Sequence, residues 1–441
     1  MGMNHSLTVQ VVIALLVLVL LAGGCASQNE GGTRERSAGP RAAATSPLYV
    51  EMDLAASEGS VQAIQLYEGD GEARLPVVEL GSADALTLEF DLMTEAGRPL
   101  SVYFYHADRT WRRDLSPGEY LASFQHDDLL EYQVSTGTQV PYAHYTYRFP
   151  NGDIEFLISG NYVVRVTEQG SEEEVLLERA FFITEQSAAL EFGTDRVLVG
   201  NYGYPSIQPI ARFRPPAELA GNVFDYNVCF VRNGRFDLAR CSDRPSLANS
   251  PLMQFYLEPE VSFEPEEPPY FLDVSDLRAS SQIESSDFST SPFRVELEPD
   301  YARFGGSGVG PLLNGQSRIS SVVRTGNADT EAEYVLTRFA YVPPEEERVG
   351  NEVLVTGSFN GWRYDATNTL TWVAERGRYE GDILLKQGQY EYRYVGRDPR
   401  LAQSLSTNMP RAENQYTTLV YFDDASLNTD RLLAVREAVS E

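Results

Sequence analysis

The stretch Leu86-Thr87-Leu88-Glu89-Phe90-Asp91-Leu92 decides the fold class, because apolar and polar side chains alternate along it. Alternation with a period of two is typical of a β-strand that buries one face. His144-Tyr145-Thr146-Tyr147-Arg148-Phe149 repeats the pattern, and the turn residues Pro150-Asn151-Gly152-Asp153 follow it. Further strands of this kind are predicted at residues 101–105, 162–166 and 175–183. Residues 47–187 are therefore predicted to form an N-terminal β-sandwich.

Strand-like segments continue to the end of the chain. In the middle region, residues 188–335, they are shorter, and an acidic, proline-rich loop interrupts them at residues 258–269. The strand-like pattern is clear again in residues 336–425, which are predicted to form a C-terminal early-set sandwich. A short terminal segment, residues 426–441, follows, and residues 431–439 within it are expected to be helical. The sequence thus predicts an all-β protein with two to three immunoglobulin-like or early-set sandwiches in tandem.

The composition excludes some classes of partner. The 441 residues include 64 Asp and Glu but only 35 Lys and Arg, which gives a net charge of −29. Nucleic acids and anionic lipid surfaces both require basic patches, so neither is an expected partner. The basic residues are almost all arginine, and Lys386 is the single lysine. The 42% hydrophobic content is enough for substantial cores.

The N-terminus has the features of an export signal. Residues 11–21 are apolar, but a bilayer-spanning helix needs roughly 20 such residues. A short apolar run that ends in small residues indicates a cleavable signal. Leu21-Ala22-Gly23-Gly24-Cys25 resembles a bacterial lipobox. The resemblance implies removal of the signal peptide, residues 1–24, and a diacylglycerol anchor on Cys25.

Residues 25–46 are rich in Gly, Ser, Ala, Arg and Glu, and they are predicted to form a flexible tether. With the lipid on Cys25, the protein would be a membrane-anchored lipoprotein that does not cross the bilayer. An ordinary secretory signal with an incidental cysteine is the alternative, since residues 1–10 contain no Lys or Arg.

Two further cysteines, Cys229 and Cys241, are an even number in an exported chain. Their flanks are strand-like, and Asn233-Gly234 lies between them, so a hairpin could bring the two thiols together. A disulfide is predicted, and two buried free thiols are the alternative.

The sequence contains no familiar catalytic motif. Beyond the signal, the histidines are His106, His126 and His144, and no zinc, serine-nucleophile or redox signature occurs. No catalytic residue, metal site or cofactor is predicted, although a carboxylate pair for glycoside hydrolysis stays an alternative. Tyr105-His106-Ala107-Asp108-Arg109-Thr110-Trp111 is predicted to be a strand end that enters an ordered loop, with Trp111 packed as an anchor. Pro141-Tyr142-Ala143-His144-Tyr145 favours a cross-strand aromatic pair.

A sharp local motif lies in the predicted C-terminal sandwich. Val355-Thr356-Gly357-Ser358-Phe359-Asn360-Gly361-Trp362, followed by Gly388-Gln389-Tyr390-Glu391-Tyr392-Arg393-Tyr394, resembles the early-set sandwich of family 48 carbohydrate-binding modules. In the glycan-binding members, Trp362 would be a stacking platform, Arg393 would occupy the position of a sugar-contacting lysine, and Asn414 would lie near a sugar-binding asparagine. Their second platform tryptophan has no counterpart in Val395-Gly396-Arg397-Asp398, which disfavours glycan binding. The same residues could instead contact a partner protein.

A second resemblance covers about residues 61–435. It is carried by motifs that occur in a shared order along the chain, among them Ile64-Gln65-Leu66-Tyr67, the Tyr105–Trp111 cluster, Arg232-Asn233-Gly234-Arg235-Phe236, Phe271-Leu272-Asp273-Val274-Ser275-Asp276-Leu277-Arg278 and Asp430-Arg431-Leu432-Leu433. Together they resemble the plug protein family of the bacterial type IX secretion system. The chain departs from the family in having Ala107 in place of a cysteine, and in having a lipobox where many members have a plain export signal.

The resemblance implies a non-enzymatic, all-β periplasmic protein without a cofactor. Such a protein would dock on the large outer-membrane translocon barrel and seal its pore at rest. The lipid on Cys25 would hold it at the periplasmic face of the outer membrane. A glycan-binding lipoprotein is the alternative function.

Overall fold

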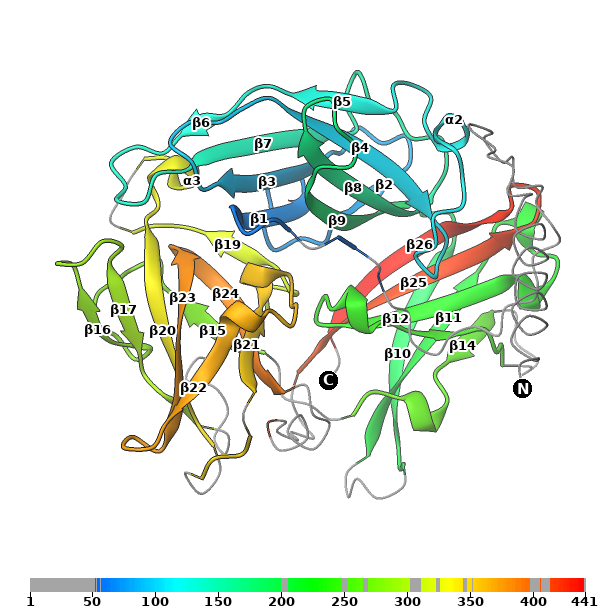
Figure 1. The fold of residues 1–441 in the computed structure, drawn as a ribbon. Helices are drawn as coiled ribbons and strands as arrows, with labels where there is room; N and C mark the ends of the chain where they lie inside the picture. The colour runs from blue at the N-terminus through cyan, green and yellow to red at the C-terminus, as the bar shows by residue number, and fades with distance from the viewer. Residues whose placement is uncertain are drawn as a thin grey trace, which may run out of the picture. The chain divides into compact units, whose positions relative to one another are not determined.

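Strands carry most of the regular structure in the computed structural model (Figure 1). The structure describes residues 52–439 apart from residues 53, 56, 200–204, 247–251, 265–268, 302–310, 323–325, 344–346, 351, 397–404 and 406–412. Within these ranges the strands form five sheets.

The first two sheets form the N-terminal sandwich. One has the order β1 (Val61–Glu68), β3 (Leu86–Leu92), β7 (Ala143–Phe149) and β6 (Gln133–Val134). The other has the order β2 (Val77–Glu79), β9 (Val175–Thr184), β8 (Gly160–Glu168), β4 (Leu100–Ala107) and β5 (His126–Leu129).

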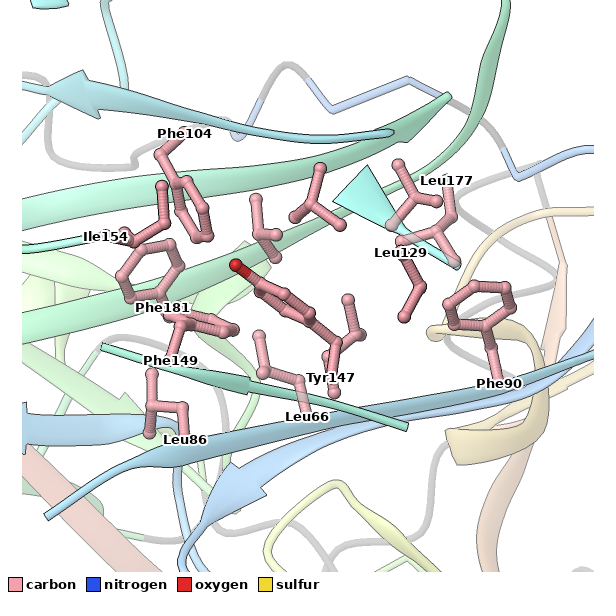
Figure 2. Close-up of a cluster of buried hydrophobic side chains, with 14 of the residues drawn as sticks. Leu66, Leu86, Phe90, Phe104, Leu129, Tyr147, Phe149, Ile154, Leu177 and Phe181 are labelled. Atoms are coloured by element: carbon pink, nitrogen blue, oxygen red, sulfur yellow. The ribbon is translucent and has the colours of Figure 1, made fainter. Parts of the chain in front are cut away.

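Aromatic rings fill the core between these two sheets. Figure 2 shows Phe104, Phe149 and Phe181 grouped together, and their ring centroids lie 4.9 to 6.1 Å apart. Phe90 stacks on its cross-strand partner Tyr145 at 5.1 Å, which confirms the predicted aromatic pair. The apolar positions of the alternating segments therefore point into this core, as a period of two requires.

The middle region also contains two sheets. One has the order β10 (Ala189–Val197), β11 (Ser206–Arg214) and β14 (Met253–Tyr256). The other has the order β13 (Arg240–Ser242), β12 (Tyr226–Arg232), β25 (Gln415–Asp424) and β26 (Thr429–Val439). Figure 1 shows the last two strands, in red, beside the green β12. Buried side chains of both sheets, including Phe213, Tyr226 and Tyr416, share one core.

A ten-stranded sheet forms the C-terminal part of the fold. Its main path is β15 (Tyr270–Asp273), β24 (Gly388–Gly396), β21 (Val353–Gly357), β22 (Thr369–Val373), β23 (Arg378–Lys386), β20 (Tyr334–Val342), β17 (Arg294–Leu297) and β16 (Ile283–Asp287). Off this path, β18 (Asp300–Tyr301) pairs with β20, and β19 (Ser317–Ile319) pairs with β24.

Helices in the described residues are single turns. The α-helices are α2 (Pro117–Tyr120) and α3 (Ala328–Glu331). The 3-10 helices are η1 (Ala217–Leu219), η2 (Val223–Asp225), η3 (Phe236–Leu238), η4 (Pro259–Val261), η6 (Ser358–Asn360) and η7 (Ala366–Asn368).

The prediction of an all-β fold built from sandwiches is confirmed, whereas the predicted helix at residues 431–439 is wrong. These residues lie in β26, which pairs with β25 along its whole length. A short apolar run does not distinguish a helix from a strand, and here the open edge of β25 decides for the strand.

Some strands lie in other sheets than the sequence pattern predicts. β25 was expected in the C-terminal sandwich but pairs with β12 of the middle region, because Tyr416 and Val420 pack in the middle core. Strands β15 to β19, which precede residue 335, join the ten-stranded sheet. The domain boundaries stay a prediction.

Candidate functional site

The predicted lipid attachment residue, Cys25, lies outside the described residues, as do the predicted signal and tether. In the part of the chain that is described, no helix combines the length and the hydropathy that a membrane crossing requires.

The predicted cysteine pair lies on neighbouring strands. Cys229 of β12 and Cys241 of β13 face each other directly in the antiparallel register, and the structure joins them in a disulfide. Asn233 and Gly234, which follow β12, both have positive φ angles, 51° and 65°. The chain therefore turns where the Asn-Gly pair predicted a turn.

Trp362 is not the open platform that sugar stacking requires. Its side chain is buried, and its indole Nε1 donates a hydrogen bond to the carbonyl oxygen of Gly315 at 3.0 Å. The guanidinium of Arg235 covers the ring at 4.5 Å from the centroid. A sugar stacks on an exposed aromatic face, so the covered ring of Trp362 disfavours the glycan-platform interpretation, which stays a prediction.

Asn414 and Arg393 likewise form no open sugar site with Trp362. Asn414 is buried and accepts a hydrogen bond from the Asn233 side chain at 2.7 Å. Arg393 is half-buried on β24, where its charge favours the ionised form of Glu391. Asn414 contacts the Asn233-Gly234-Arg235 turn from just before β25, within the middle region. Trp362 contacts the same turn through Arg235, and this contact joins the C-terminal sheet to the middle region.

This junction is closed by two turns that touch through their backbones. A Cβ atom added at Gly234 would overlap the carbonyl oxygen of Asn314. Behind Asn314, the buried carboxylate of Glu391 accepts backbone hydrogen bonds from Leu313 at 2.8 Å and from Gly315 at 2.7 Å. Burial raises the pKa of Glu391 to about 7, although these hydrogen bonds and Arg393 favour the charged form.

Glu391 therefore makes the stability of the junction depend on pH. A carboxyl group whose pKa is higher in the folded state binds more protons there than in the unfolded chain. Its contribution is complete below its ordinary pKa of 4.5 and is lost as the pH rises through about 7. We expect Glu391→Gln to remove up to about 3 kcal/mol of that pH dependence, measured as the free energy of unfolding between pH 4.5 and 8. The exposed Glu131→Gln serves as the control, and an identical pH profile for both variants would contradict this expectation.

A second junction joins the N-terminal sandwich to the C-terminal sheet through polar side chains. Cross-strand pairs place Glu89 opposite Thr146 and Asp91 opposite His144, all on one face of β3 and β7. Glu89, Asp91 and His144 are nevertheless buried. His144 Nδ1 lies 2.8 Å from Asp91 Oδ1, and its Nε2 lies 3.2 Å from the Thr146 hydroxyl and 3.8 Å from Glu89 Oε1.

The single lysine of the chain completes this junction. Lys386, at the end of β23, is buried, and its Nζ donates to Asp91 Oδ2 at 2.7 Å and to the carbonyl oxygen of Asp329 at 2.6 Å. The Tyr334 hydroxyl donates to the same Asp91 oxygen at 2.7 Å, and Lys386 Nζ lies 4.2 Å above the Tyr142 ring. Asp91 thus receives partners from both sides of the junction.

The charges of this junction shift one another's titration. Burial opposes protonation of His144, but hydrogen bonds to Asp91 and Glu89 outweigh it and raise the pKa of His144 to about 9. Burial also disfavours the charged form of Glu89, yet hydrogen bonds with His144 and Tyr67 lower its pKa. Burial, followed by the charge of Glu89, raises the pKa of Asp329 and raises the pKa of Glu72 to about 7.

A third junction joins the N-terminal sandwich to β25 and β26. The backbone N–H of Arg109 donates to Asp430 Oδ2 at 3.1 Å, and the Tyr421 hydroxyl donates to Asn161 Oδ1 at 2.7 Å. The prediction that Trp111 packs as an anchor is confirmed, because its ring is buried 5.5 Å from that of Phe182.

Sequence reasoning missed the Lys386–Asp91 junction. Its single signal was the presence of one lysine in a chain that otherwise uses arginine, and that signal named no partner. The alternating polar residues of β3 and β7 are equally typical of a strand face that is exposed to solvent.

The chain is similar to one known protein family in sequence and to one solved protein in fold. Residues 61–185 match the family described as the type 9 secretion system plug protein 1st domain. The chain is similar in structure to a hypothetical protein from Parabacteroides merdae ATCC 43184, known from a crystal structure. The TM-score is 0.78, and the match covers 89% of this chain and 100% of the other. At 20% identity that likeness shows the fold alone. No curated protein matches the chain. The matched residues run from β1 to the end of β9, so the similarity to type 9 secretion system plug protein first domains covers the N-terminal sandwich.

Proposed function

We propose that the protein is a non-enzymatic plug subunit that seals the pore of a large outer-membrane translocon barrel in a type IX-like secretion system. The family match over residues 61–185 supports a role in this kind of secretion. A barrel that is wide enough for folded proteins would leak solutes when no substrate is being exported, so a rigid protein must close the pore.

The observation that carries the proposal is that each of the three regions is tied to the other two by polar contacts, two of which are buried. Lys386–Asp91 ties the N-terminal sandwich to the C-terminal sheet, and Arg109–Asp430 ties it to the middle region. Between the middle region and the C-terminal sheet, Asn314 Nδ2 donates to Glu437 Oε2 of β26 at 3.1 Å, and the Arg235 guanidinium lies 4.5 Å from the centroid of the Trp362 ring. Buried polar contacts between regions favour one arrangement of the parts, whereas flexible tandem domains have small, wet interfaces. A single rigid unit can close a pore more effectively than tandem domains that move relative to one another.

The anchor belongs to the same proposal. A diacylglycerol on Cys25 and a tether of residues 25–46 would hold the plug at the periplasmic face of the outer membrane and raise its effective concentration near the barrel. The lipid would be its contact with the membrane, because a chain of net charge −29 is repelled by anionic lipid headgroups.

An epistasis experiment tests the function. Deletion of the gene is expected to let vancomycin through the outer membrane, and deletion of the translocon barrel in the same strain is expected to restore exclusion, because the leak runs through the barrel. The protein should also co-purify with the barrel from detergent-solubilised outer membrane, and palmitate labelling should depend on Cys25. Intact vancomycin exclusion in the single deletion would refute the plug. A leak that persists without the barrel would place the defect elsewhere in the envelope.

A further inference from the structure

A cavity of about 340 Å³ opens beside the Lys386–Asp91 junction. Tyr67, Thr87 and Thr146 line it together with four carboxylates, Asp70, Glu72, Glu89 and Asp329, and two guanidiniums, Arg148 and Arg318. Arg148 pairs with Asp70, and Arg318 lies 4.0 Å from Glu72. The two arginines are therefore directed at Asp70 and Glu72, whereas Glu89 and Asp329 have no guanidinium partner among the described residues that line the cavity.

Glu89, Asp329 and His144 converge at this place. One ligand atom of each residue lies within 4.8 Å of the ligand atoms of the other two, and both Glu89 and His144 are buried. The three come from separate elements, since Glu89 lies on β3, His144 on β7 and Asp329 in α3. A salt bridge on one strand pair needs two of these groups, whereas three converging ligands are the minimum of a protein metal site.

The carboxylate behind His144 is the arrangement found behind metal-binding imidazoles, and an ion would displace the Nε2 proton that the raised pKa of His144 otherwise keeps on the ring. Its Nδ1 is held 2.8 Å from Asp91 Oδ1, so the ring is oriented with Nε2 toward Glu89. A carboxylate behind the imidazole is the usual device that fixes the tautomer and orientation of a histidine ligand. Lys386 and the Tyr334 hydroxyl hold Asp91 from its other side.

Two hydrogen bonds hold the backbone of Asp329 in place. The side chain of Asn327 caps α3 by accepting the backbone N–H of Asp329 at 3.0 Å, and Lys386 Nζ binds the Asp329 carbonyl oxygen. The carboxylate of Asp329 is left on the cavity side, where Glu72 is a further oxygen donor.

We propose that Glu89, His144 and Asp329 bind one divalent transition-metal ion at the junction between the N-terminal sandwich and the C-terminal sheet. One imidazole nitrogen with two carboxylate oxygens suits zinc and its neighbours better than magnesium or calcium, which prefer all-oxygen sites. Coordination at about 2.0–2.2 Å requires the ligand atoms to lie closer together than they do here, so binding would draw the three side chains together. The ion would cross-link the two regions, whether or not the plug proposal holds.

Isothermal titration of the full chain in detergent with ZnCl2 tests the site. We expect one zinc ion per chain, and binding weakened about tenfold or more in Asp329→Asn. Asp329 is the informative position because it is half-buried in a single turn, whereas His144→Gln removes a buried group and could unfold the chain. The exposed Asp84→Asn is the matched control and should bind zinc as the wild type does.

X-ray absorption at the zinc edge gives an independent readout. We expect scattering from one imidazole, with the other ligands oxygen, and little competition from excess calcium or magnesium. Absence of zinc binding, equal affinities in the Asp329→Asn and Asp84→Asn variants, or a spectrum without imidazole would each overturn the proposal.

Discussion

Replacement of Lys386 by methionine is expected to lower the free energy of unfolding by about 3 kcal/mol. The substitution keeps the length of the side chain but removes the ammonium group that hydrogen-bonds Asp91 at 2.7 Å in a buried site. Loss of one member of a buried ion pair leaves the other charge without compensation, at a cost of about 3–5 kcal/mol. His144 and Tyr334 still contact Asp91, so the lower end of that range is expected.

The measurement is chemical denaturation of the wild type and of the variant, followed by tyrosine and tryptophan fluorescence. Arg74→Met is the matched control, because the Arg74 side chain is 65% exposed and lies 3.7 Å from Glu68. An exposed pair of this kind contributes about 1 kcal/mol or less. The double variant Lys386→Met/Asp91→Asn should recover part of the loss, since it leaves no uncompensated carboxylate. If Lys386→Met were as stable as Arg74→Met, the Lys386–Asp91 pair would not hold the junction together.

Gly234→Ala is the second variant with a large expected effect. Gly234 has φ +65°, and a Cβ there would overlap the backbone oxygen of Asn314, which cannot move without opening the junction. Gly69 supplies a matched control, since its φ is +63° but a Cβ there would meet no atom within 4 Å. The left-handed conformation itself costs an alanine about 1–2 kcal/mol at either position.

We therefore expect Gly69→Ala to lose only that amount and Gly234→Ala to lose several kcal/mol in total, a size usually associated with a specific structural conflict. Limited proteolysis should locate the damage, because cleavage near residues 311–315 should accelerate in Gly234→Ala alone. Equal destabilisation of the two variants would mean that the two turns do not press on each other in solution.

The sequence predicted the elements best where one physical rule acts locally. The alternation in residues 86–92 and 144–149 predicted β3 and β7, and the apolar positions do face the core. The Asn233-Gly234 turn and the packed Trp111 were predicted for the same kind of reason. The prediction that residues 431–439 are helical was wrong. A nine-residue run of apolar and polar residues carries no information about the neighbouring strand β25, whose edge these residues pair with.

The predicted site residues show a different limit. The resemblance to carbohydrate-binding modules placed Trp362 and Asn414 in a local motif, and the motif does adopt a strand followed by a turn. Whether an aromatic ring is open or covered depends on residues far away in the chain. Arg235 covers Trp362 from 127 positions earlier, and no local pattern specifies that contact.

By itself, the sequence determined that the protein is all-β and which face of each alternating strand is apolar, because a period of two follows from backbone geometry alone. Only the tertiary structure determined whether the opposite, polar face of each strand is exposed or buried. Glu89, Asp91 and His144 had the signature of a solvated surface, yet they are buried because Lys386, Tyr334 and α3 close over them. Alternation shows that a strand has two faces, but whether the polar face is buried depends on partners that lie some 180 to 300 residues away.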